Sequence, residues 1–138
     1  MEYKVQGNVA IVRMQKGEEV ISSLLALIDK LDIKSGRVSG IGATDNVTIG
    51  VFNANTKEYT KNCVREAMEI LSLSGNLSRM NGKPYAHIHG SFASLDRVYG
   101  GHVNEIYISA TAELIIDIFD IIVEREFDKE TGLNLIKL

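Results

Sequence analysis

The sequence predicts an α+β domain in which a mostly antiparallel, multi-stranded sheet packs against one main helix. Apolar residues recur at helical spacing in one segment only, residues 20–31. Most other apolar segments are rich in β-branched residues, and turn sequences separate them. The chain has 138 residues, the length of a domain with one core, so we expect a single compact domain over residues 1–138.

Charge and cysteine content narrow the class of protein. The net charge is −3 and no basic cluster is present, which argues against direct binding of nucleic acid. The single cysteine, Cys63, excludes an internal disulfide and fits a reducing cytoplasm. The first residues lack the apolar core of a signal peptide, and the most apolar run, residues 114–123, contains two aspartates. We therefore expect a soluble cytoplasmic protein without membrane partners.

The first third of the chain predicts a strand, the helix and a second strand. Val5–Met14 has the β-branched content of a strand. Gly17-Glu18-Glu19 opens the helix, where the acidic side chains favour its positive end. Its apolar face is formed by Val20, Ile21, Leu24, Leu27, Ile28 and Leu31. Arg37–Ala43 follows as a short strand, whose glycines at positions 40 and 42 allow a bulge or a close backbone approach.

A meander of strands is expected next. Asp45-Asn46 predicts a turn into the strand Val47–Asn53, and a further turn leads into Thr56–Asn62. The alternating segment Glu66–Leu77 predicts another strand, in which Glu69 shares a face with leucines. We interpret Glu69 as an exposed or paired residue rather than a carboxylate in a cavity, because unpaired charges are rare in cores.

The last part of the chain predicts a hairpin and a long strand. Asn81-Gly82 is a hairpin turn that leads into the strand Tyr85–Phe92. After the polar turn Ser94–Arg97, we expect a strand from about His102 to Ile116, although a helix over residues 112–119 is an alternative. Residues 124–130 are predicted to be charged and exposed, and a turn then leads into a short tail over residues 133–136.

All three histidines of the chain fall in one window of the sequence. His87 and His89 project from the same face of the predicted strand, because side chains alternate along a strand. If the next strand pairs back on it, His102 meets them. Three imidazoles with an open fourth position suit zinc or another divalent transition metal. The alternative is that the imidazoles only form hydrogen bonds at a half-buried surface or a subunit interface.

Four segments, in order, resemble one known family: Leu71–Asn76, His87-Ile88-His89, Gly100–Val103 and Ala110–Glu113. They resemble the plant- and prokaryote-conserved (PPC) domain in its stand-alone prokaryotic form. The resemblance implies a compact domain with an antiparallel sheet, a homotrimer, and a metal-binding role for His87, His89 and His102. In plants the domain follows a DNA-binding AT-hook, a segment that this chain lacks.

Three functions are compatible with these features. The first is a homotrimeric binding or regulatory module with a three-histidine metal site, whose ligand is a small molecule or a protein. The second is a metal-dependent, hydrolase-like enzyme that uses metal-bound water, with Glu105 or Asp96 as its base. Glu105 alternates away from His102, however, and Asp96 reads as a solvated turn residue. The third is DNA binding, by kinship with AT-hook proteins.

Overall fold

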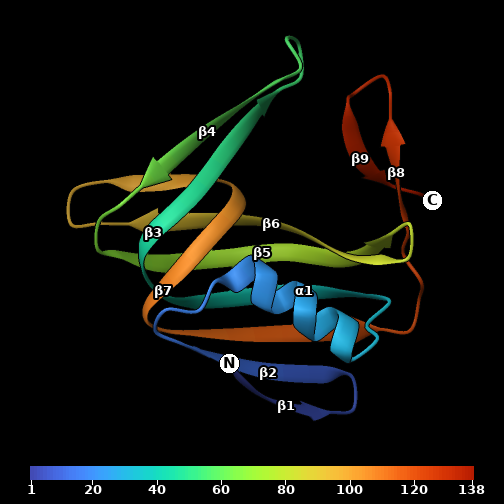
Figure 1. Cartoon of the computed structure of the whole chain (residues 1–138), viewed down its shortest axis with the longest axis horizontal. Helices are drawn as coiled ribbons and strands as arrows, with labels where there is room; N and C mark the ends of the chain where they lie inside the picture. Colours follow the sequence, from blue (N-terminus) through green and yellow to red (C-terminus); the bar gives the residue numbers. More distant parts are fainter.

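Nine strands and one helix make up the chain, whose residues 1–138 are all described in this computed structural model. In chain order they are β1 (Glu2–Gln6), β2 (Val9–Gln15), α1 (Val20–Lys30), β3 (Ser35–Asn53), β4 (Glu58–Val64), β5 (Met68–Met80), β6 (Lys83–Ala93), β7 (Val98–Phe119), β8 (Arg125–Asp128) and β9 (Leu133–Ile136). Seven strands form one antiparallel sheet in the order β1-β2-β7-β6-β5-β3-β4, and β8 and β9 form a separate hairpin (Figure 1). The predicted α+β class, with one main helix on a mostly antiparallel sheet, is confirmed.

Two long, bent strands connect the halves of the sheet. β3 has 19 residues and β7 has 22, and they pair with each other along most of their length (Figure 1). The turn predicted at Asp45-Asn46 is wrong, because β3 continues through it with an irregular register. The hydroxyl of Thr44 donates to the carbonyl oxygen of Tyr107 at 2.7 Å and accepts from the amide of Asn46 at 3.2 Å. These bonds satisfy backbone groups that the irregular register leaves unpaired.

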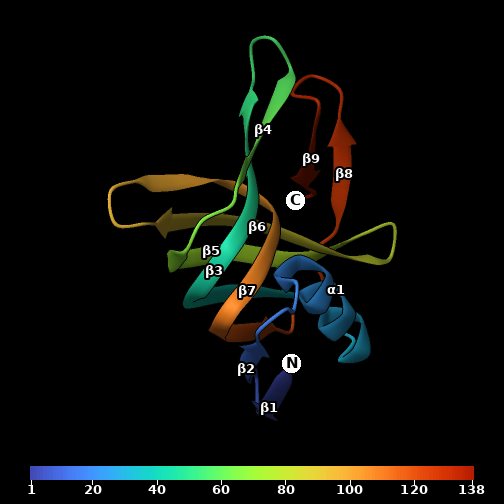
Figure 2. The same ribbon diagram turned by 60° about the vertical axis from the view of Figure 1, so that its left-hand side comes forward.

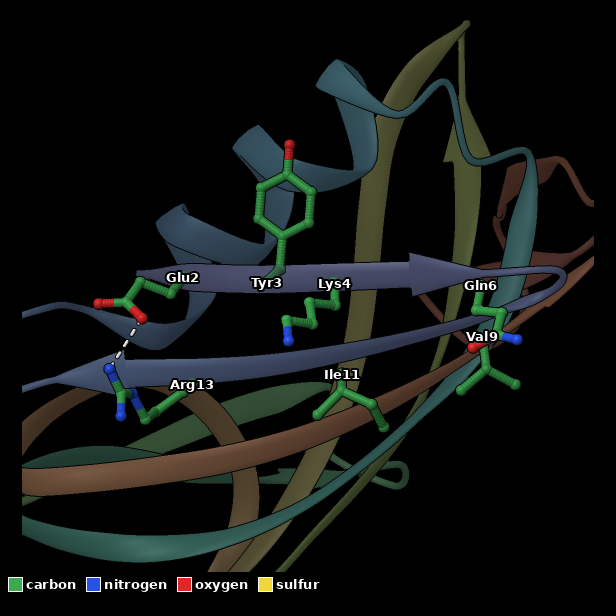
Figure 3. Close-up of a pocket in the computed structure, with 7 residues that line it drawn as sticks. All are labelled: Glu2, Tyr3, Lys4, Gln6, Val9, Ile11 and Arg13. Carbon is green, nitrogen blue, oxygen red and sulfur yellow. Dashed lines mark hydrogen bonds and ion pairs between the residues drawn. The ribbon is translucent and has the colours of Figure 1, made fainter.

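The N-terminal segment is a hairpin. The single strand predicted over Val5–Met14 is divided by a turn at Gly7, whose φ of +58° suits glycine. The resulting strands β1 and β2 lie side by side, and Arg13 of β2 donates to Glu2 of β1 at 2.8 Å (Figure 3). The hairpin adds β1 as the edge strand of the sheet.

The helix α1 is joined to the sheet at its N-terminus. The Glu19 carboxylate caps it by accepting from the amides of Ile21 and Ser22, at 2.9 and 2.7 Å. The same carboxylate accepts from the amide of Ile106 in β7 at 3.1 Å. The buried side chains of α1 are Val20, Leu24, Leu27 and Ile28, which belong to the core between helix and sheet. This helix is too short to cross a membrane, and no other helix is present.

The C-terminal hairpin differs from the exposed, charged segment that the sequence predicts for residues 124–130. Arg125, at the start of β8, is only 7% exposed. The β8–β9 hairpin and β4 lie on the side of β5 and β6 that is opposite to α1, and both views agree on this (Figures 1 and 2). Tyr85 of β6 faces this side, because its ring lies 4.8 Å from the Arg125 guanidinium, and His87 and His89 follow at alternate positions on the same face.

Candidate metal centre

The strands β6 and β7 bring the three histidines together. His87 and His89 lie on one face of β6, whereas Ile88 between them points into the core and is 1% exposed. β7 pairs back on β6 in antiparallel register and sets His102 directly opposite His89. β7 begins at Val98 rather than near His102, so the glycines at positions 100 and 101 belong to the strand. The predicted convergence of the imidazoles follows from this hairpin.

The rings form a compact triangle. Their centroids are 5.1 Å apart for His87 and His89, 5.1 Å for His87 and His102, and 5.6 Å for His89 and His102. One ring nitrogen from each histidine lies within 4.8 Å of the others. In a tetrahedral zinc site, bonds of about 2.0–2.1 Å separate ligand atoms by about 3.3 Å, so small side-chain rotations close the difference.

The environment of the cluster favours neutral imidazoles. The pKa of His87 is lowered to about 4, first by burial and then by the charges of His102, Arg125 and His89, in that order of importance. Burial, and then His89, also lowers the pKa of His102. Both rings therefore hold free nitrogen lone pairs at neutral pH, which is the state that binds a metal.

A tyrosine that the sequence analysis missed flanks His102. Tyr59 of β4 lies edge-on to the His102 ring, with centroids 6.1 Å apart, and its hydroxyl donates to Asn104 Oδ1 at 2.8 Å. Burial raises the pKa of the Tyr59 phenol, and the bond to Asn104 opposes that change. Gly50 of β3 makes the space, because a Cβ there would lie 2.3 Å from the tyrosine ring. Gly50 lies directly opposite His102 in the register of β3 and β7.

Arg125 flanks His87 and was also missed. Its Nη2 donates to Oδ1 of Asn76, the residue directly opposite His87 in the β5–β6 ladder. Its Nε donates to Ser78 Oγ at 2.9 Å, and its guanidinium lies 4.8 Å from the centre of the Tyr85 ring. An arginine inside a run of charged residues gives no sequence signal of burial.

The carboxylates singled out in the sequence lie away from the histidine cluster. Glu105 is exposed and accepts from the Thr48 hydroxyl at 3.5 Å. Asp96 is exposed in the β6–β7 turn, where it contacts Ser94 and Arg97. Glu69 is exposed as well, in agreement with the structural interpretation. The candidate metal ligands are therefore three histidines without a carboxylate.

The protein is therefore an α+β domain that has one helix on an antiparallel sheet and a three-histidine cluster on two adjacent strands. The sequence profile of the Plants and Prokaryotes Conserved (PCC) domain matches residues 1–120. The chain belongs to this family, which is the one that the sequence motifs resemble.

Solved structures agree with this assignment. A metal-containing protein from Archaeoglobus fulgidus is 34% identical over 97% of this chain and 95% of its own, with a TM-score of 0.87. A suggested DNA-binding protein from Bacteroides thetaiotaomicron is 32% identical over 99% of this chain and 96% of its own, with a TM-score of 0.95. A plant- and prokaryote-conserved protein from Pyrococcus horikoshii is 28% identical over 99% and 95%, with a TM-score of 0.87. None of the curated proteins compared with the chain matches it.

Proposed function

We propose that this protein is a homotrimeric binding or regulatory module whose three histidines, His87, His89 and His102, hold a divalent transition metal, zinc before others. The observation that carries the proposal is the convergence of all three histidines, with nitrogen atoms within 4.8 Å of one another. Such a set leaves a fourth position open, at which a metal in the site can bind a ligand.

Three further features support the metal. Burial disfavours the protonated forms of His87 and His102, so protons compete weakly with a cation at neutral pH. Imidazole ligands suit zinc, copper, iron and nickel, whereas calcium and magnesium prefer oxygen ligands. The A. fulgidus relative is a metal-containing protein at 34% identity.

The exposed face of the sheet supports self-association. Ile11, Ile41, Leu71 and Ile115 lie on the neighbouring strands β2, β3, β5 and β7, and each is 47–59% exposed. They share one shallow hollow with Arg13 and Glu113. A second hollow continues it over β1 and β2, where Lys4, Ile11 and Val9 line the open face (Figure 3). Contiguous apolar surface of this kind is typical of an interface, and copies of the chain are the occupant that we propose.

Two other functions remain as alternatives. A metal-dependent hydrolase would need a base near the histidines, and neither Glu105 nor Asp96 contacts them. A screen of the metal-loaded protein on ester, phosphate and amide substrates tests that alternative. DNA binding rests on relatives with that suggested role. A duplex mobility shift that weakens with added salt would support it, against the chain's net charge of −3.

The first experiment is the metal content of protein purified without a histidine tag, with the mass in solution measured on the same sample. We expect about one zinc per chain in a trimer. Replacing His89 with alanine should abolish the metal and leave the fold intact. Stoichiometric metal in His89→Ala would refute the three-histidine site, and a metal-free wild-type protein that takes up no added zinc would refute the metal itself.

A further inference from the structure

Arg125 is a buried cation without a counter-ion. Its residue is 7% exposed, and no carboxylate oxygen lies within 4 Å of its guanidinium nitrogens. Its partners are neutral oxygens, on Asn76, Ser78 and the carbonyl of Asn134. Burying an unpaired charge is costly, so buried arginines are normally paired with carboxylates or ligands.

The other buried arginine of the chain follows that rule. Arg79 is 6% exposed and lies 3.3 Å from Asp29 and 3.4 Å from Asp32, in addition to its bonds with carbonyl groups at the end of α1. One buried arginine is therefore paired with carboxylates, whereas the other bonds only to neutral oxygens. The two arginines also differ in their surroundings, because only Arg125 lies beside the histidine cluster, through its bond to Asn76 opposite His87.

The register of β5 and β6 fixes that position. Asn76 is opposite His87 and Ser78 is opposite Tyr85, and Arg125 donates to both β5 residues. Its guanidinium also lies over the Tyr85 ring, two residues before His87 on the same face of β6.

Nothing acidic balances this charge at the cluster. The candidate ligands are three histidines, and no carboxylate belongs to their cluster. A divalent cation held by three neutral imidazoles would add two more positive charges. The complete site therefore has an excess of positive charge that an anion can neutralise.

We propose that Arg125 makes this site selective for small molecules bearing an oxyanion, a carboxylate or a phosphate, with one oxygen at the open metal position and the group as a whole attracted by the guanidinium. This inference rests on the proposed metal site. A guanidinium has five N–H donors, of which the contacts above use three, so two remain for a ligand. Arg125 lies beyond residues 1–120, the part that the family profile matches.

A purely structural role for Arg125, as the tether of the β8–β9 hairpin, makes a different prediction. Removing a tether would change the affinities for the metal and for every ligand alike. Removing a residue that selects anions would change the affinity for anions alone. The comparison uses cobalt-loaded protein, because the visible absorption of Co²⁺ reports ligands at its open position. The probes are acetate, inorganic phosphate and, as the uncharged metal ligand, imidazole.

Three variants separate charge from structure. Arg125→Gln removes the charge and keeps an amide donor, and Arg125→Lys keeps the charge. Lys16→Gln is the control, because Lys16 is exposed in the turn before α1 and its loss changes the net charge of the protein equally. Cobalt affinity and circular dichroism are measured on every variant before the titrations.

We expect Arg125→Gln to lower the affinity for acetate or phosphate at least about tenfold, which corresponds to the loss of one charge-assisted hydrogen bond. The affinities for cobalt and for imidazole should change less than about threefold. Arg125→Lys should retain most of the anion affinity, and Lys16→Gln all of it. If acetate affinity falls more than phosphate affinity, a carboxylate is the preferred group, and the reverse result identifies a phosphate. Equal losses for imidazole and anions in Arg125→Gln, or no loss at all, would overturn the proposal.

The wild-type protein gives a second test that does not depend on variants that fold. The Arg125 Nε–H resonance, assigned by ¹⁵N labelling, should shift during an acetate or phosphate titration of protein loaded with zinc. A resonance that stays in place while the anion binds contradicts the role of Arg125. If the protein takes up neither cobalt nor zinc, the metal site has failed and this inference with it. If metal binds and the anion data do not depend on Arg125, the inference alone has failed.

Discussion

His89 and His102 are directly opposite each other in the β6–β7 ladder, with ring centroids 5.6 Å apart. The pairing is set by backbone hydrogen bonds rather than by a ligand. His87 joins them from the same face of β6, two residues before His89. The triangle of imidazoles is therefore part of the folded sheet, so binding a metal requires little ordering of the chain.

A cation that binds only the folded state stabilises it. Zinc at about 100 times its dissociation constant should raise the free energy of unfolding by about 2.7 kcal/mol, and a chelator should remove that gain. Thermal unfolding of the wild type with zinc and with chelator measures it. In His89→Ala the two curves should coincide, whereas in Lys16→Gln, an exposed control, they should differ as in the wild type. A zinc shift that persists in His89→Ala would place the cation elsewhere.

The stability of the metal-free protein should fall in mild acid. The pKa of His87 is lowered to about 4 in the folded protein, from an ordinary value of 6.5. Between these values the unfolded chain binds a proton that the folded one does not, so stability rises with pH across this window and is lost as pH falls from 6.5 towards 4. The depressed pKa of His102 acts in the same direction.

For His87 alone the loss is about 3 kcal/mol at most. Chemical denaturation of chelator-treated protein at pH 7, 6, 5 and 4 measures it, and His87→Gln should flatten the profile. Carboxylates contribute to acid denaturation of both proteins, so the difference between the two profiles is the informative quantity. Profiles that run parallel would show that His87 has an ordinary pKa in the folded protein.

The histidine cluster could be predicted from the sequence because its geometry is local. Strand alternation relates His87 to His89, and a short turn returns the chain to His102. The helix was predicted for the same reason, since its apolar spacing and its acidic start lie within one segment. The family resemblance rested on four short segments, two of which contain the histidines, and it is confirmed by the profile match.

The flanks of the site could not be predicted, because long-range packing forms them. Tyr59 reaches His102 from β4 across a glycine of β3, and Arg125 comes from a hairpin that reads as solvated charge. The continuity of β3 through Asp45-Asn46 was missed likewise. The polar pair reads as a turn in isolation, whereas the Thr44 bonds and the pairing of β3 with β7 and β4 keep the strand extended.

The neighbouring glycines Gly100 and Gly101 should differ in their tolerance of a methyl group. A Cβ on Gly101 would lie 2.8 Å from the carbonyl oxygen of Gly50, whereas the nearest atom to a Cβ on Gly100 is 3.3 Å away. We expect Gly101→Ala to lower the free energy of unfolding by about 1–3 kcal/mol. It should also lower the affinity for zinc, because His102 is the next residue. Gly100→Ala is the matched control and should cost less. Denaturant titration and zinc affinity measure both effects, and equal costs would contradict the close approach of β3 and β7.

The cap of α1 should contribute to the stability of the whole domain. Glu19 accepts from three backbone amides, two in the helix and that of Ile106 in β7. Alanine there would leave these donors without a partner, so we expect a loss of about 2–4 kcal/mol in the free energy of unfolding. Glu19→Gln keeps one acceptor oxygen and should cost less. Glu130→Ala, at an exposed position without an ion pair, controls for the loss of one acidic charge and should change stability little.

Trimer formation should depend on the apolar face of the sheet. Ile41 is 59% exposed on β3 and shares its hollow with Ile11, Leu71 and Ile115. A glutamate at this position would bury a charge in the proposed interface, so Ile41→Glu should dissociate the protein. Light scattering after size exclusion should give three times the 15.2 kDa chain mass for the wild type and the single chain mass for the variant.

Val51 provides the control for that experiment. It lies on the same strand, is 65% exposed and is outside the hollow, so Val51→Glu should remain trimeric. Circular dichroism establishes that both variants are folded, and their zinc content shows whether the histidine site depends on assembly. Because all three histidines converge within one chain, a folded Ile41→Glu monomer should still bind zinc. A trimeric Ile41→Glu, or a monomeric wild type at micromolar concentration, would remove this face as the interface.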